Sequence, residues 1–270
     1  MSGGMPVGLV GMTNDRTSRP RRPKSKFSRL WVPNQPGAWV MVLAPAVAGT
    51  LAGGTGWRGA WLTVAWLGCY CTQFTAARWL ASHGRRRYLA PVLTYAGVTC
   101  ALGLPLLIME PRLLWWAPFY VVVAGASFLL AWMRRDRSLA AQTAAVLAAG
   151  GIGAAAAGMG AITRASAVVG IAFALFEFGQ LLFVPSMAVG RAGRESTHAY
   201  YIASVALSAA LACAGFAVHP LLGAAGVLLF ARAAALPRLA AHGVIPPLAA
   251  APSELVTSAV MVAAVAVAAG

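Results

Sequence analysis

Apolar residues dominate the chain from residue 37 onward, in long stretches separated by short polar segments. Each stretch has roughly the 17 to 25 residues that an α-helix needs to cross the hydrocarbon core of a bilayer. They predict nine helices, over residues 37–54, 59–80, 89–109, 113–133, 138–161, 167–189, 199–218, 220–236 and 252–269. The pattern therefore predicts an all-α fold, a polytopic transmembrane bundle of about nine helices in which residues 37–270 form one domain.

Composition agrees with a membrane protein and argues against other classes. Of the 270 residues, 60% are hydrophobic and only 10% are charged, whereas a soluble domain carries about 25% charged residues. A mean hydropathy of +0.73 also argues against a disordered chain. The four cysteines are scattered without metal-ligand spacing, so we expect neither a disulfide framework nor a metal site, and no cofactor.

Basic residues are unevenly distributed between the predicted helices. With the N-terminus in the cytoplasm, 18 of the 21 Lys and Arg residues lie on the cytoplasmic side, and only Arg58, Arg112 and Arg164 lie outside. Because Lys and Arg near helix ends resist translocation, we predict an N-terminus inside and a C-terminus outside. Residues 1–36 hold seven of these basic residues and several prolines. We expect a disordered cytoplasmic arm that contacts anionic lipid headgroups, not nucleic acid.

Small residues recur at four-residue spacing in two of the predicted helices. Gly49 and Gly53 form a G-x-x-x-G step, and Gly150, Ala154 and Gly158 continue the pattern in the Ala- and Gly-rich fifth helix. Small residues let helix backbones approach closely within a membrane. The fifth helix is therefore predicted to be central and closely packed.

A few polar side chains fall inside the predicted spans or at their ends. They are Gln73, Gln142, Glu177, Gln180, Arg232 and Glu254. Ionisable groups at membrane depth are costly and usually face the bundle interior. Glu177 and Arg232 lie at similar depths, so we predict that they pair, with Glu254 as the competing partner of Arg232. Glu177 then has two open interpretations: a structural staple, either paired or protonated, or a substrate or proton site.

A second candidate site is an arginine cluster in two predicted cytoplasmic loops. Its members are Arg134, Arg135, Arg137, Arg191 and Arg194. One interpretation is an ordinary positive-inside turn, in which Asp136 or Ser138 caps the following helix. The other interpretation is a clamp in which the guanidinium groups bind a phosphate or a carboxylate.

The start of the first helix carries a distinctive motif. Residues 33–39 read Pro-Asn-Gln-Pro-Gly-Ala-Trp, and Met41 and Pro45 follow. With this motif the chain resembles the YwiC-like family of bacterial membrane proteins. Weaker matches are found at residues 85–88, 136–139, 194–195 and 254–256.

Within that motif, Gly37, Ala38 and Trp39 are the most specific part of the resemblance. Pro36 stands where the family usually has His, so any role of that histidine in proton transfer is absent or relocated here. The resemblance implies a multi-pass protein of the bacterial cytoplasmic membrane and no specific activity.

Three functions stay open at this point. The first is the handling of a small or lipidic anionic ligand at the cytoplasmic face. The second is an enzyme, because nine helices with this topology are similar to the UbiA prenyltransferase superfamily. Its enzymes hold Mg²⁺ and a prenyl diphosphate on two Asp-rich motifs. This chain has no D-x-x-x-D, so that metal chemistry would be lost.

The third function is that of a non-catalytic membrane assembly partner. Whether the bundle interior contains a cavity would distinguish the first function from the third. A cavity lined by Gln73, Gln142, Glu177 and Arg232 would favour ligand handling, and a filled centre would favour assembly.

Overall fold

The computed structural model describes residues 30–33, 36–187, 194–242, 244 and 250–270. Within them the chain forms the nine predicted α-helices and two short 3₁₀ segments, η1 and η2. The helices are α2 (Pro36–Ala52), α3 (Gly56–Ala81), α4 (Leu89–Met109), α5 (Ala117–Trp132), α6 (Leu139–Gly158), α7 (Arg164–Ser186), α8 (Arg194–Val218), α9 (Pro220–Ala241) and α10 (Ala250–Ala269). The 3₁₀ segments are η1 (Arg86–Tyr88) and η2 (Pro111–Trp116). The all-α prediction is confirmed, and α9 extends five residues beyond its predicted end.

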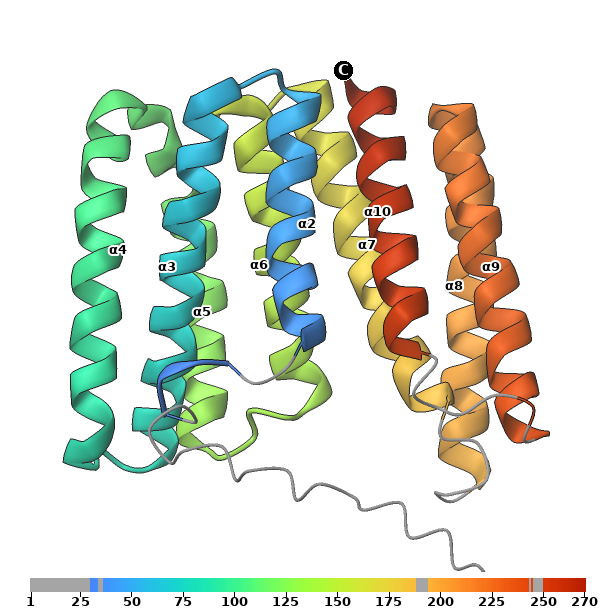
Figure 1. Cartoon of the computed structure of the whole chain (residues 1–270), viewed down its shortest axis with the longest axis horizontal. Helices are drawn as coiled ribbons and strands as arrows, with labels where there is room; N and C mark the ends of the chain where they lie inside the picture. Colours follow the sequence, from blue (N-terminus) through green and yellow to red (C-terminus); the bar gives the residue numbers. More distant parts are fainter. Residues whose placement is uncertain (1–29, 34–35, 188–193, 243, 245–249) are drawn as a thin grey trace, which may run out of the picture.

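Seven continuous helical spans in the described residues are long and apolar enough to cross a membrane: η1 with α4, η2 with α5, and the helices α6 to α10. Helix α2 is equally apolar but shorter, and α3 is longer but more polar. The helices run side by side and alternate in direction, with α4 at one edge of the bundle and the α8–α9 pair at the other (Figure 1).

Helix α6 lies in the middle of the bundle and packs against α2, α3, α5 and α7. Its residues 149–157 are all buried. A Cβ atom added at Gly49 of α2 would lie 2.1 Å from the Gly153 carbonyl oxygen, and one at Gly53 would lie 2.0 Å from that of Ala157. The predicted close packing is therefore confirmed, and it brings the backbones of α2 and α6 together.

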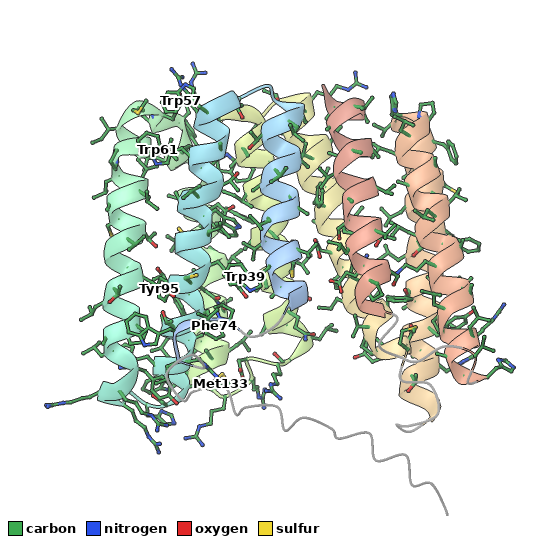
Figure 2. The ribbon with its side chains drawn as sticks, in the orientation of Figure 1. Trp39, Trp57, Trp61, Phe74, Tyr95 and Met133 are labelled. Carbon is green, nitrogen blue, oxygen red and sulfur yellow. The ribbon has the colours of Figure 1, made fainter. Side chains whose placement is uncertain are left out.

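The alternation of helix direction gives the bundle two different ends. Exposed arginines gather where α3, α5 and α9 end, at residues 85–87, 134, 135, 137 and 238. We call this the arginine-rich end. The opposite end carries Arg58, which forms an ion pair with Glu110, and the labelled Trp57 and Trp61 (Figure 2). The helices thus separate the basic residues as predicted, while the side of the membrane that each end faces stays a prediction.

The last part of the predicted N-terminal arm lies against the bundle. The Trp31 carbonyl oxygen accepts a hydrogen bond from the Tyr95 hydroxyl of α4 at 3.0 Å, and the two rings lie 6.1 Å apart. The Pro33 carbonyl oxygen accepts one from Trp39 Nε1. The disorder predicted for residues 1–36 stays a prediction, because residues 1–29 and 34–35 lie outside the described residues.

Candidate functional site

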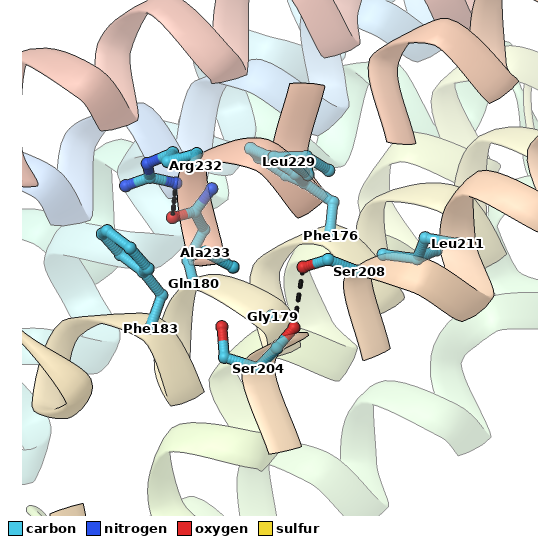
Figure 3. A pocket seen from close by; sticks show the side chains of 10 residues that line it. All are labelled: Phe176, Gly179, Gln180, Phe183, Ser204, Ser208, Leu211, Leu229, Arg232 and Ala233. Carbon is cyan, nitrogen blue, oxygen red and sulfur yellow. Dashed lines mark hydrogen bonds between the residues drawn. The ribbon is translucent and has the colours of Figure 1, made fainter. Parts of the chain in front are cut away.

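Arg232 is the centre of a polar cluster between α7, α9 and α10. It lies halfway along α9, and its side chain is 8% exposed. Its Nε donates to Ser253 Oγ of α10 at 3.0 Å, and its Nη1 donates to Gln180 Oε1 of α7 (Figure 3) and to Thr257 Oγ1 of α10 at 3.4 Å. The guanidinium carbon also lies 3.9 Å from the centre of the Phe183 ring. All of these partners are neutral.

The predicted Glu177–Arg232 ion pair is wrong. Among the described residues the ion pair found is Arg58–Glu110, and the Arg232 guanidinium is bound by Gln180 instead. Equal depth in the membrane does not fix the direction in which a side chain points. Gln180 and the hydroxyl groups of α10 occupy the space around the guanidinium.

Glu177 lies one helical turn before Gln180 on α7 and is more deeply buried. Only 4% of it is exposed, and its Oε1 has no hydrogen-bond partner. A carboxylate without donors is expensive in apolar surroundings. This environment favours the neutral carboxylic acid form of Glu177.

Glu254 lies on the first turns of α10, towards the arginine-rich end, and is partly exposed. It interacts electrostatically with both Glu177 and Arg232, but it forms no ion pair with Arg232 within 4 Å. Its carboxylate lies beside α2, because a Cβ atom added at Gly37 would be 3.3 Å from Glu254 Oε1. The glycine of the sequence motif therefore leaves the space that this carboxylate uses.

A small cavity lies on the other side of Arg232, between α7, α8 and α9. Its volume is about 10 Å³, space for roughly one water molecule. Ser204 and Ser208 of α8 line it (Figure 3), and Ser208 Oγ donates to the Ser204 carbonyl oxygen at 2.7 Å. Two buried atoms of its lining residues, Ser204 Oγ and Arg232 Nη2, have no hydrogen-bond partner.

Gln73 and Gln142 do not join this cluster. Gln73 Nε2 donates to Ser127 Oγ at 2.8 Å, which links α3 to α5, and Gln142 is exposed near the start of α6. The four residues whose shared cavity would favour ligand handling, Gln73, Gln142, Glu177 and Arg232, are therefore not brought together. In the described part of the chain the centre of the bundle is occupied by α6, whose residues 149–157 are buried.

The arginine turns are placed only in part. Arg134, Arg135 and Arg137 are exposed between α5 and α6, and Ser138 Oγ caps α6 by accepting from the Ala141 amide. The capping interpretation is confirmed for Ser138, whereas the anion clamp stays a prediction. Arg191 lies outside the described residues, as does the side chain of Arg194, the first residue of α8.

The motif residues at the start of α2 have structural partners. Trp39 packs edge-on against Tyr70 of α3, with ring centres 5.6 Å apart. Ala38 is partly buried next to it, and Pro36 is the first residue of the helix. These contacts anchor α2 to α3, while Gly37 faces Glu254 on α10.

The sequence analysis missed the hydroxyl groups around Arg232. They occur as two pairs at four-residue spacing, Ser253 with Thr257 on α10 and Ser204 with Ser208 on α8. Residues four apart share a helix face. A paired hydroxyl face on an otherwise apolar span is therefore the signal that could have found them.

The comparison with protein-family models gives one match, in which residues 32–157 match the model of the YwiC-like proteins. No curated protein matches the chain, and no solved structure matches it. The matched region covers α2 to α6 and confirms the resemblance, and it ends before the helices that carry Glu177, Arg232 and Glu254. Together with the seven long apolar helices, it indicates a multi-pass membrane protein. The likeness to the UbiA superfamily stays a prediction.

Proposed function

We propose that helices α7 to α10, which follow the region similar to the YwiC-like proteins, bind a small anion at Arg232. The observation that carries this proposal is a buried guanidinium group whose bonded partners are all neutral. Its Nη2 group has no acceptor and lies in a residue that lines the cavity between α7, α8 and α9.

The charge balance of the cluster supports an anionic ligand. A buried cation is costly unless an anion or a full set of hydrogen bonds compensates for its lost hydration. Arg232 has the oxygen atoms of Gln180, Ser253 and Thr257, while Glu254 acts on it only at a distance. An anion would supply the missing charge, and guanidinium donors bind anions strongly.

The size of the cavity favours a small anion over a lipidic one. A volume of about 10 Å³ suits a ligand close in size to a water molecule. Chloride and formate come near this size, whereas inorganic phosphate and a lipid headgroup would need the helices to separate.

The arginine-rich end supports an approach from the cytoplasm. Its exposed arginines, at residues 85–87, 134, 135 and 137, would raise the local concentration of anions. The positive-inside rule assigns this end to the cytoplasmic side. A reporter active only outside the cytoplasm, fused after Gly270, should be active, while one active only inside should not. The reverse result would overturn this orientation.

Thermal unfolding of the purified protein tests the anion site. Chloride and formate should raise the Tm in a concentration-dependent way, because a ligand that binds only the folded state stabilises it. Inorganic phosphate should have a smaller effect. Arg232→Gln should abolish the increase, while Arg164→Gln, at the opposite end of the bundle, should keep it. An equal increase in the Arg232→Gln variant would contradict the proposal.

A second candidate function is that of a membrane assembly partner, and the buried α6 at the bundle centre favours it. Affinity purification of the full-length protein from its own membranes would test this function. A stoichiometric partner that is retained by Arg232→Gln would support it. Purification of the chain alone, together with a Tm that responds to anions, would favour the anion site.

A further inference from the structure

We infer that Glu177 is a proton-binding site in the membrane interior, and that it exchanges its proton with the arginine-rich end through Glu254. This activity is separate from the anion site and does not depend on it. It rests on the burial of Glu177, on its unpartnered oxygen, and on the position of Glu254 between Glu177 and that end.

The surroundings of Glu177 favour its protonated form. The residue is 4% exposed, and its Oε1 receives no hydrogen bond. An ionised carboxylate at this depth would need several donors to replace its hydration. Phe173 and Phe176, which precede it on α7, belong to the apolar core and offer none. The neutral acid is therefore the form that fits this position.

Polar groups of α7 and α10 lie between Glu177 and the arginine-rich end. Gln180 of α7 and Thr257 of α10 lie at the same level and are linked by a hydrogen bond of 3.5 Å. Glu177 lies one turn deeper than this level on α7, and Glu254 lies about one turn nearer the arginine-rich end on α10. The two carboxyl groups interact electrostatically, and Glu254 is partly exposed. Glu254, the Gln180–Thr257 pair and Glu177 thus follow one another from the arginine-rich end towards the membrane interior.

The charged groups around Glu177 are few. Helices α2 and α6 contain no ionisable side chain, and Glu254 is the only one in α10. Helix α9 contributes Arg232 and Arg238. In α8 the ionisable residues lie in the first turns, at positions 194, 195, 198, 200 and 201, apart from Cys213. Glu254 is therefore the carboxylate placed to receive a proton from Glu177.

The proposed transfer moves one proton from Glu177 to Glu254 and then to water. The two carboxyl groups are separated by six residues of helix rise, about 9 Å, so the proton passes between them through water. The O–H bond of Glu177 breaks as a water molecule accepts the proton, and the Glu254 carboxylate forms a new O–H bond with a proton released by this water. Glu254 then gives this proton to water at the arginine-rich end, which leaves Glu177 ionised, and the reverse sequence restores the acid. Gly37 permits this route because its missing side chain leaves space for the Glu254 carboxylate.

Infrared spectroscopy of the purified full-length protein tests the inference. The difference spectrum between the wild type and Glu177→Gln should contain the carbonyl band of a protonated carboxylic acid at neutral pH. In heavy water the band should shift as the proton exchanges for deuterium. Glu254→Gln should slow this exchange about a hundredfold or more, the lower end for loss of a proton-transferring group. Gly37→Ala, which keeps both carboxyl groups, should slow it less.

Glu110→Gln is the matched control, because it removes a carboxylate at the opposite end of the bundle. Exchange in this variant should match the wild type. Absence of the acid band would overturn the inference, and so would exchange in Glu254→Gln or Gly37→Ala as fast as in Glu110→Gln. The anion-dependent Tm is a separate measurement, so a failure here leaves the anion site standing.

Discussion

The two halves of the bundle treat their buried polar groups differently. In α2 to α6 these groups are neutral and satisfied. Trp66 Nε1 donates to the Val42 carbonyl oxygen, and Tyr120 donates to that of Ala148. In α7 to α10 the cluster includes Glu177 and Arg232, and the three buried side-chain atoms found without a partner in the described residues all lie there. The first half is built as a scaffold, and the second carries groups whose hydrogen bonds are incomplete.

The largest effect is expected where α2 meets α6. Gly49→Ala would place a methyl group 2.1 Å from the Gly153 carbonyl oxygen, which belongs to the backbone and cannot rotate away. We expect a loss of about 3 kcal/mol or more in the free energy of unfolding, at the upper end for overpacking. Reversible unfolding in detergent would measure it. Gly97→Ala, where a Cβ meets no atom within 4 Å, should cause no loss and should raise stability by about 0.5 to 1 kcal/mol through the better helix propensity of Ala. Equal losses would show that the scaffold does not depend on this contact.

The next effect compares two glutamines, one in each half. Gln180→Leu removes an acceptor from the buried Arg232 guanidinium, and we expect it to cost about 2 to 3 kcal/mol. Gln73→Leu removes a neutral hydrogen bond to Ser127 and should cost about 0.6 kcal/mol, as for such bonds in other membrane proteins. The same unfolding assay measures both variants. Equal costs would remove the distinction between the halves.

Replacement of Glu177 tests whether this residue of the second half is structural or functional. Its Oε1 receives no hydrogen bond, so Glu177→Leu should raise the free energy of unfolding by about 1 kcal/mol, as replacements at strained functional sites often do. A loss of stability in this variant would instead make Glu177 a structural staple. The control is Glu177→Gln, which keeps the shape and should change stability less.

The smallest effect belongs to a tryptophan of the scaffold. Trp66→Phe removes the 3.2 Å hydrogen bond to the Val42 carbonyl oxygen and should cost about 0.6 kcal/mol. Trp115 is 83% exposed, so Trp115→Phe should change less in the same assay. A larger loss for Trp115 would indicate that the exposed aromatic residues, rather than the buried hydrogen bonds, stabilise this half.

Most of the fold could be predicted from the sequence because hydrophobic length and small-residue spacing are local properties. Nine apolar stretches predicted the helices. The spacing of Gly49 and Gly53 predicted a close helix contact, but not that its partner is α6. The end of α9 was placed too early, at residue 236, whereas the helix continues through the buried Pro237 to Ala241.

The candidate site was predicted only in part. Depth along a helix can be counted from the sequence, so Gln180 and Arg232 were placed at the same level, and a hydrogen bond joins them. The direction of each side chain around its helix depends on the packing of distant segments. Gln73 and Gln142 were therefore assigned to the cluster, although Gln73 bonds to α5 and Gln142 is exposed. The hydroxyl groups of Ser253 and Thr257 were not considered.

The backbone-to-backbone contact of α6 with α2 constrains how this protein can change shape. Residues 149–157 of α6 are Ala or Gly except for Ile152, so this helix has no long side chain there whose rotation could open a passage. The α8–α9 pair is itself tightly joined, since a Cβ atom at Gly226 would lie 2.4 Å from Ala212 Cα. Large displacements are therefore expected as movement of this pair as a unit past α7 and α10. Because Arg232 belongs to α9, the positive charge would travel with the pair while Gln180, Ser253 and Thr257 stay behind.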